Sequence, residues 1–263
     1  MARTLRPLAA GGAAFLSYGP QVGEMAAPQR QQLLLEHYSF TCSCPACASA
    51  EAAAAEASLV GLRCTAGAGC EGAVVPPGPL PAGVVSQHAL GRGDGACSRC
   101  GAMLALEEWQ GRMLPQLEQA AASHEAALQA LQRLGPEASS QGILPVVRVL
   151  REVLRQRQQL LHPRNQLLGA THDALACAWN AAGTPEPAAQ HLRHSLAALQ
   201  RAYPHNSTAV AFQQCKLAAL LRAVAAGGGE AAEAEADRLL EAASQTLQLH
   251  FGPQAASKLL AQA

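Results

Sequence analysis

Seven of the nine cysteines fall between residues 42 and 100, and they form two sets with the close spacing of metal ligands. They are Cys42, Cys44, Cys47, Cys64, Cys70, Cys97 and Cys100. Thiolates suit zinc, and a structural zinc site needs four ligands. In a chain without a secretion signal, clustered cysteines favour metal over disulfides. We therefore expect this part of the chain to be organised by bound metal.

The first set lies in the stretch HYSFTCSCPAC, with Cys42, Cys44 and Cys47 on one tight loop. Three thiolates at this spacing can converge on one zinc ion, but they leave the site one ligand short. His37 is close in sequence and stays open as a fourth ligand. The competing interpretation is three incidental cysteines.

The second set is complete by itself, because Cys64 and Cys70 pair with Cys97 and Cys100 to give four thiolates. The stretch CSRCG is similar to the knuckle of a zinc ribbon. The long loop between the pairs costs little, since closure entropy grows slowly with length. An oxidation-prone loop is the alternative, and His88 is an alternative ligand.

Composition excludes several classes of function. Formal net charge is zero, charged residues are 14% and aromatic residues 3%, so nothing predicts direct binding to nucleic acid or to an anionic membrane. No apolar run is long enough to span a bilayer. The N-terminal LRPLAAGGAAFL is interrupted by Pro7, Gly11 and Gly12, unlike a signal peptide. We expect a reducing compartment, the cytoplasm and the nucleus.

The pattern predicts a mostly α-helical fold. A short strand is expected within residues 3–18, after a turn at Gly11 and Gly12, and a helix over 28–37. The segment 51–62 is a helix-prone connector. From Leu106 onward apolar residues recur at helical spacing, as in Leu144, Val147, Leu150 and Leu154.

The tail also repeats. HPRN at 162–165 recurs 41 residues later as YPHN at 203–206, and FGPQ at 251–254 marks a third junction. Pro163 and Pro204 are expected to open helices. The pattern predicts pairs of helices similar to tetratricopeptide repeats.

Other reactive side chains in the tail point to no site. We expect Cys177 and Cys215 to be buried as small apolar residues. Five histidines are scattered through the predicted helices, and each is expected to be an ordinary surface or core residue. They are His124, His162, His172, His191 and His194. No nucleophile–base pair is evident.

The stretch RTLRPLAAGGAAFLSYG, followed by a helix and HYSFTCSCPAC, resembles the end of a SET domain with its post-SET cysteines. With the helical tail, the chain resembles the SET and MYND domain-containing lysine methyltransferases. The resemblance implies the end of a SET domain over 1–20, a post-SET helix and cysteine cluster over 21–50, a linker and zinc-ribbon-like insert over 51–105, and helical repeats over 106–263.

The resemblance also implies roles for single residues. Members of this family transfer a methyl group from S-adenosylmethionine to lysine side chains of histones or other proteins. Tyr18 matches the tyrosine that lines the lysine channel, and Phe40 matches the aromatic residue beside the adenine of the cofactor, with Tyr38 next to it. The three cysteines of the first set match the post-SET zinc ligands.

The chain departs from the family pattern in ways that bear on activity. It contains no Asn-His-x-Cys motif, which carries the fourth zinc ligand in the family, and no glycine-rich cofactor loop. Where the family has Gly-Glu-Glu before the last strand, this chain has Gly12, Ala13 and Ala14. We therefore expect it to be the C-terminal part of a longer methyltransferase, and inactive by itself.

A non-enzymatic alternative stays open. A zinc-stabilised module joined to helical repeats can act as an adaptor that holds a protein segment in the repeat groove, because such arrays form concave surfaces. The sequence predicts protein partners under either hypothesis.

Overall fold

The computed structural model describes residues 7–13, 19, 22, 27–67, 69–76, 95–135 and 138–261. Most of the strand expected within 3–18 lies outside these residues, as do Tyr18 and His88. The expected glycine turn is confirmed, because the Gly12 amide donates to the Ala9 carbonyl over 2.9 Å and Gly11 has a φ of 79°. Glycine adopts such a φ readily because it has no Cβ.

Three helices precede the second cysteine set. They are α1 (Ala27–Tyr38), α2 (Pro45–Ala48) and α3 (Ala50–Val60). The first confirms the helix expected over 28–37, and the third confirms the helix-prone connector. Ser49 caps α3 by accepting the Ala52 amide over 3.3 Å, which satisfies one of the free donors at the helix start.

The segment around the second cysteine set contains little regular structure. Strands β1 (Leu62–Arg63) and β2 (Ala73–Val74) form one short antiparallel ladder. Isolated bridges extend it from Val74 to Cys97 and from Ala96 to Met103. Such a small ladder buries too little surface to be stable alone.

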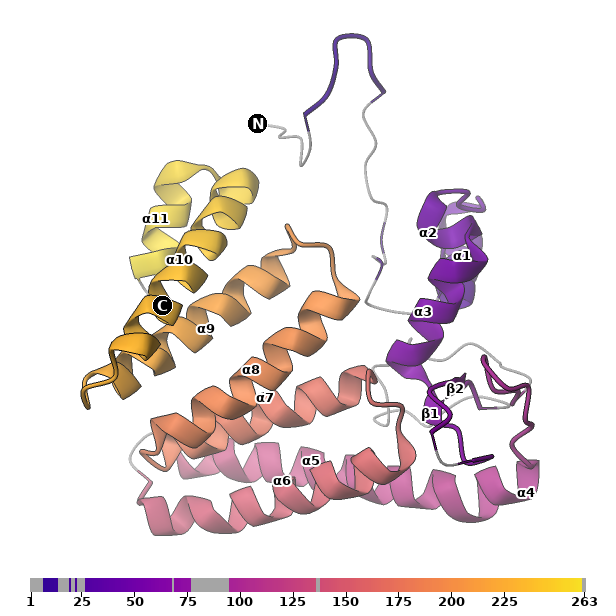
Figure 1. Ribbon diagram of the computed structural model, residues 1–263, viewed down its shortest axis with the longest axis horizontal. Helices are drawn as coiled ribbons and strands as arrows, with labels where there is room; N and C mark the ends of the chain where they lie inside the picture. The colour runs from indigo at the N-terminus through magenta and orange to yellow at the C-terminus, as the bar shows by residue number, and fades with distance from the viewer. Residues whose placement is uncertain are drawn as a thin grey trace.

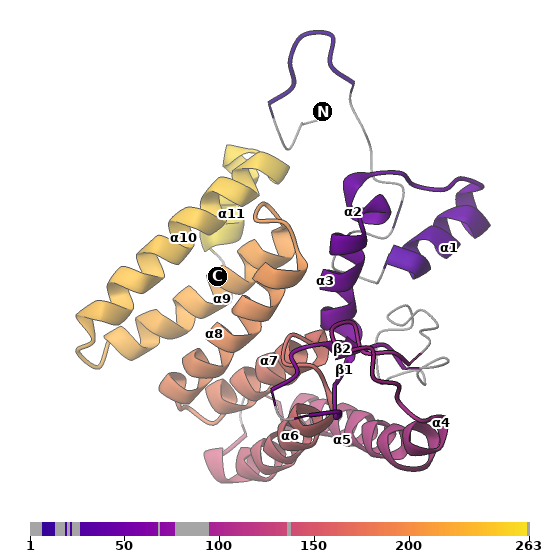
Figure 2. The same ribbon diagram turned by 45° about the vertical axis from the view of Figure 1, so that its right-hand side comes forward.

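The rest of the chain is a succession of helices. They are α4 (Leu106–Glu108), the π-helical turn η1 (Trp109–Met113), α5 (Leu114–Leu134), α6 (Ser140–Leu160), α7 (Gln166–Ala181), α8 (Pro185–Ala202), α9 (Thr208–Ala225), α10 (Glu230–Phe251) and α11 (Pro253–Ala261). From α5 to α11 each helix packs on the next one in sequence. Figures 1 and 2 show these helices as one arm, with α1 to α3 forming a second arm beside β1 and β2.

The junctions of the tail are confirmed as breaks between helices, but the prolines do not act as expected. Pro163 and Pro204 lie in the turns, and α7 and α9 begin later, where Asn165 and Ser207 accept backbone amides as N-caps. A capping side chain satisfies the free amides of the first turn, so it fixes the helix start in place of the proline.

The core confirms the helical spacing of α6 with one correction. Val147, Leu150 and Leu154 are buried, but Leu144 is 42% exposed and Ile143 is fully buried in its place. Ile143 fits because it lies four residues before Val147, on the same face of the helix.

Small residues bring neighbouring helices close together. A Cβ placed on Gly169 of α7 would lie 2.6 Å from the Ala198 Cβ of α8.

Cys215 is buried, as expected, but Cys177 is exposed. The expectation for Cys177 was wrong because the core face of α7 carries Ala174 and Ala178, whereas Cys177 lies on its flank.

The segment that carries the second cysteine set packs against α5, α6 and the turn that follows α6. The His162 ring contacts the Glu71 carbonyl over 3.1 Å, and the Asn165 side chain donates to the Gly61 carbonyl over 2.9 Å. One apolar cluster combines Leu62 and Val74 with Trp109, Met113, Leu117, Leu160 and Leu161. The HPRN stretch therefore serves as the docking point for the cysteine-rich segment.

Within the described residues, no helix has the length and apolarity that a membrane crossing requires.

Candidate metal centres

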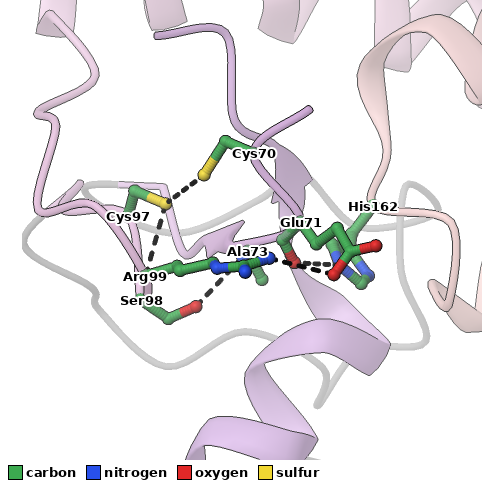
Figure 3. Close-up of polar contacts among 7 residues, drawn as sticks. All are labelled: Cys70, Glu71, Ala73, Cys97, Ser98, Arg99 and His162. Atoms are coloured by element: carbon green, nitrogen blue, oxygen red, sulfur yellow. Dashed lines mark hydrogen bonds and ion pairs between the residues drawn. The ribbon is translucent and has the colours of Figure 1, made fainter. Parts of the chain in front are cut away.

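The second cysteine set comes together as one group of four. Cys64 follows β1, Cys70 lies before β2, and Cys97 and Cys100 lie on the next turn. The Sγ atoms of Cys64 and Cys100 are 3.6 Å apart, and those of Cys70 and Cys97 are 3.7 Å apart. All four Sγ atoms lie within 4.8 Å of one another. Figure 3 shows Cys70 and Cys97 pointing toward each other from these two loops.

These distances fit a tetrahedral zinc site. Four sulfurs about 2.3 Å from one ion are separated by about 3.8 Å. A disulfide would need a sulfur separation of about 2.0 Å, and all nine cysteines are free. The four side chains therefore have the right chemistry and the right spacing to hold one structural zinc ion.

Backbone groups of the turn favour the thiolate form of this site. Burial opposes ionisation of Cys97, but backbone N–H groups of Cys100 and Arg99 lower its pKa to about 6. At Cys64 the Ala66 amide favours the thiolate, but burial and the neighbouring thiols outweigh it and raise the pKa to about 12. Neighbouring thiols resist ionising together, and a bound cation would remove that conflict.

The turn that carries Cys97 is fixed by hydrogen bonds of Ser98, and the glycine at position 72 leaves room for it. The Ser98 Oγ accepts the Ala73 amide over 3.0 Å, and the Ser98 amide donates to the Ala73 carbonyl over 2.9 Å; Figure 3 draws the first of these bonds. A Cβ on Gly72 would lie 2.3 Å from the Cys97 Sγ. Glycine at position 72 therefore leaves the space that Cys97 occupies.

The first cysteine set is held by two consecutive residues of α1. Gln31 binds Cys42 twice, donating to its carbonyl over 2.5 Å and accepting its amide over 2.8 Å. Arg30 is only 2% exposed and lies 3.7 Å from the Cys47 Sγ. Its other nitrogen pairs with Glu56 of α3 over 2.5 Å. The guanidinium therefore places positive charge beside a cluster of thiols, where it favours thiolates.

The Sγ atoms of Cys42, Cys44 and Cys47 lie within 4.8 Å of one another, and in the described part of the chain this group contains no fourth ligand. His37 is not a member of it. Burial raises the pKa of Cys47 to about 11 despite Arg30. The geometry fits three of the four positions of a zinc site.

The two rings expected to bind the cofactor precede this cluster directly in sequence. Tyr38 ends α1 and is 49% exposed, and Phe40 is 39% exposed. Between them, Ser39 has a φ of 56°, which ends the helical path of the backbone after α1. A Cβ on Gly19 would lie 3.7 Å from the Tyr38 ring, so the residue after Tyr18 in sequence passes Tyr38. The position of Tyr18 itself lies outside the described residues.

Two further features escaped sequence analysis. His172, His191 and His194 come together between α7 and α8. A groove of about 350 Å³ lies between α3 and helices α7 to α9, lined by residues that include Leu59, Asp173 and Tyr203. The spacing of His191 and His194 on one helix was a partial signal, but the position of His172 depends on how two helices pack.

Fold and site together define a mostly helical protein with two cysteine clusters suited to zinc. The chain is similar to Protein-lysine N-methyltransferase SMYD4 from Danio rerio, with 27% identity over 226 residues. The match covers 83% of this chain and 26% of the relative, so the chain spans about a quarter of the length of that protein. No family model matches the chain. The similarity supports a distant relationship to the protein-lysine methyltransferases.

Proposed function

We propose that this chain is part of an S-adenosylmethionine-dependent protein-lysine N-methyltransferase, related to the fourth member of the SET and MYND domain-containing family. The observation that carries the proposal is the convergence of Cys42, Cys44 and Cys47, which follow the exposed rings of Tyr38 and Phe40 directly in sequence. It gains support from the similarity to a protein-lysine methyltransferase over 83% of the chain. In this proposal residues 1–20 end a SET domain and residues 106–263 form tetratricopeptide-like repeats.

The proposed roles follow from chemistry. When bound, S-adenosylmethionine supplies a methyl group on a sulfonium that an amine can attack. Phe40 and Tyr38 offer exposed aromatic surface for an adenine ring. Tyr18 would orient the lysine amine in a site from which water is excluded. Zinc at the first cluster would hold Phe40 in place, because only one residue separates Phe40 from Cys42.

Protein substrates, histone or non-histone, follow from this activity, and the cytoplasm and nucleus are the proposed locations. The adaptor hypothesis is the second candidate. It gains support from the groove between α3 and helices α7 to α9, whose lining is mainly apolar and includes Asp173 and the buried Gln213. A protein segment in this groove would not need a cofactor.

The test measures cofactor binding by calorimetry and radiolabelled methyl transfer to histones and cytosolic extracts. It compares this chain with a version joined to a SET core that carries an Asn-His-x-Cys motif. We expect binding and transfer only in the joined protein, with transfer lost in Tyr18→Phe. Failure of the joined protein to bind cofactor would contradict the methyltransferase proposal and favour the adaptor.

A further inference from the structure

Three imidazoles form a row across the interface of α7 and α8. The Nδ1 atoms of His172 and His191 are 2.9 Å apart and share a hydrogen bond, which a metal ion held by both nitrogens would replace. The ring of His194, one turn beyond His191 on α8, stacks on His172 with centroids 4.6 Å apart and an interplanar angle of 27°. Histidine is the commonest protein ligand for transition metals, so a close pair of ring nitrogens is a candidate metal site away from the cysteines.

We propose that His172 and His191 form a binding site for a transition-metal ion of square-planar or octahedral preference, such as Ni²⁺. Two nitrogens about 2.05 Å from an ion and 2.9 Å apart subtend about 90° at that ion. That is the angle between adjacent ligands in square-planar and octahedral complexes. Tetrahedral zinc would need the nitrogens about 3.3 Å apart.

The surroundings keep both ligands in the form that binds metal. Burial, with weaker contributions from His194 and His191, lowers the pKa of His172 to about 4. Burial, His194 and Arg151 of α6 lower the pKa of His191. Neutral imidazole binds metal and imidazolium does not. The positive charge of Arg151 also repels a cation, so we expect moderate affinity.

The site reaches solvent on the side of His191. His191 lines a cleft of about 770 Å³ together with Trp179 and Arg151, and His194 is exposed. Among the described residues, groups of three mutually close metal ligands occur only in the two cysteine clusters. The histidines therefore supply two ligands, water completes the shell, and the stacked His194 holds the His172 ring in position.

The test is calorimetric titration with Ni²⁺ at pH 7.5 of the untagged full chain carrying Cys42→Ser, Cys44→Ser and Cys47→Ser and loaded with zinc at its second cysteine set, so that nickel cannot bind the three-thiol cluster. We expect saturable binding of one nickel ion per chain, tighter than binding of further Zn²⁺. His172→Gln and His191→Gln should each lose this binding. The matched control is His205→Gln, which removes an exposed histidine from a turn and should bind as the triple-serine chain does.

A second readout does not depend on any histidine variant. Six-coordinate Ni²⁺, with water completing its shell, is paramagnetic and should broaden the amide resonances of residues near 172 and 191 before those of α10. Nickel binding that survives in both glutamine variants, or broadening centred elsewhere, would overturn the proposal. Absence of saturable binding to the triple-serine chain would overturn it as well. Circular dichroism of each variant shows whether loss of binding reflects loss of folding.

Discussion

At the scale of single residues, Gly72 shows how the second zinc site constrains the chain. An alanine there would place its Cβ 2.3 Å from the Cys97 Sγ and 2.8 Å from the Arg99 Cβ, so the ligand turn must move. We predict that Gly72→Ala weakens zinc binding about 10- to 100-fold, the range seen when the support of a ligand is lost. Competition with a chromogenic chelator measures this. Gly67→Ala is the control, because its Cβ would meet nothing within 4 Å, and equal affinity of both variants would refute the prediction.

A single residue, Arg30, also supports the first cysteine cluster. Its guanidinium joins Glu56 to Cys47, and both Arg30 and Glu56 are buried. We predict that Arg30→Met destabilises the chain by about 3–5 kcal/mol, because it leaves a buried carboxylate without its cation. The double variant Arg30→Met with Glu56→Leu should recover much of that loss. Urea unfolding gives both values, and a double variant no more stable than the single one would contradict this account.

At the scale of elements, the segment around the second cysteine set packs against α5 and α6 and stabilises them. Strand β1 shares its apolar cluster with Trp109, Met113 and Leu161, and His162 and Asn165 bond to the same segment. We predict that Cys97→Ser, by removing zinc, lowers amide exchange protection in α5 and α6 more than in α9 and α10. Hydrogen-exchange mass spectrometry of the full chain measures this. Equal loss in all four helices, or none in α5 and α6, would contradict the docking role.

The elements also show how far sequence could predict the structure. The cysteine spacing is local, so the sequence predicted both clusters, and the HPRN and YPHN stretches predicted both breaks between helices. The starts of α7 and α9 were misplaced because the caps Asn165 and Ser207, rather than the prolines, decide them. The contact between His172 and His191 could not be predicted from the sequence, because it depends on how α7 packs against α8.

At the scale of the whole molecule, buried histidine makes stability depend on pH. The Nε2 of His124 is buried without a partner among the described residues. Burial and then Arg157 of α6 lower its pKa to about 4, against opposing effects of Glu125 and of a hydrogen bond to the Ala170 backbone. The unfolded chain takes up the proton near pH 6.5 and the folded chain only near pH 4, so stability is present above this window and falls as pH drops through it.

Between pH 6.5 and pH 4, we predict that the free energy of unfolding falls less for His124→Leu than for the unaltered chain. The two losses should differ by at most ~3 kcal/mol. Thermal unfolding followed by circular dichroism at a series of pH values measures the difference. Parallel losses in the two proteins across that window would show that His124 does not titrate as described.

Zinc X-ray absorption most directly tests whether zinc binds and organises the second cysteine set. The sample is the full chain carrying Cys42→Ser, Cys44→Ser and Cys47→Ser, so that only the second set can respond. The account predicts one zinc ion per chain, surrounded by four sulfur atoms at about 2.3 Å. A chain that folds without zinc, or a zinc ion bound mainly by nitrogen and oxygen, would contradict it.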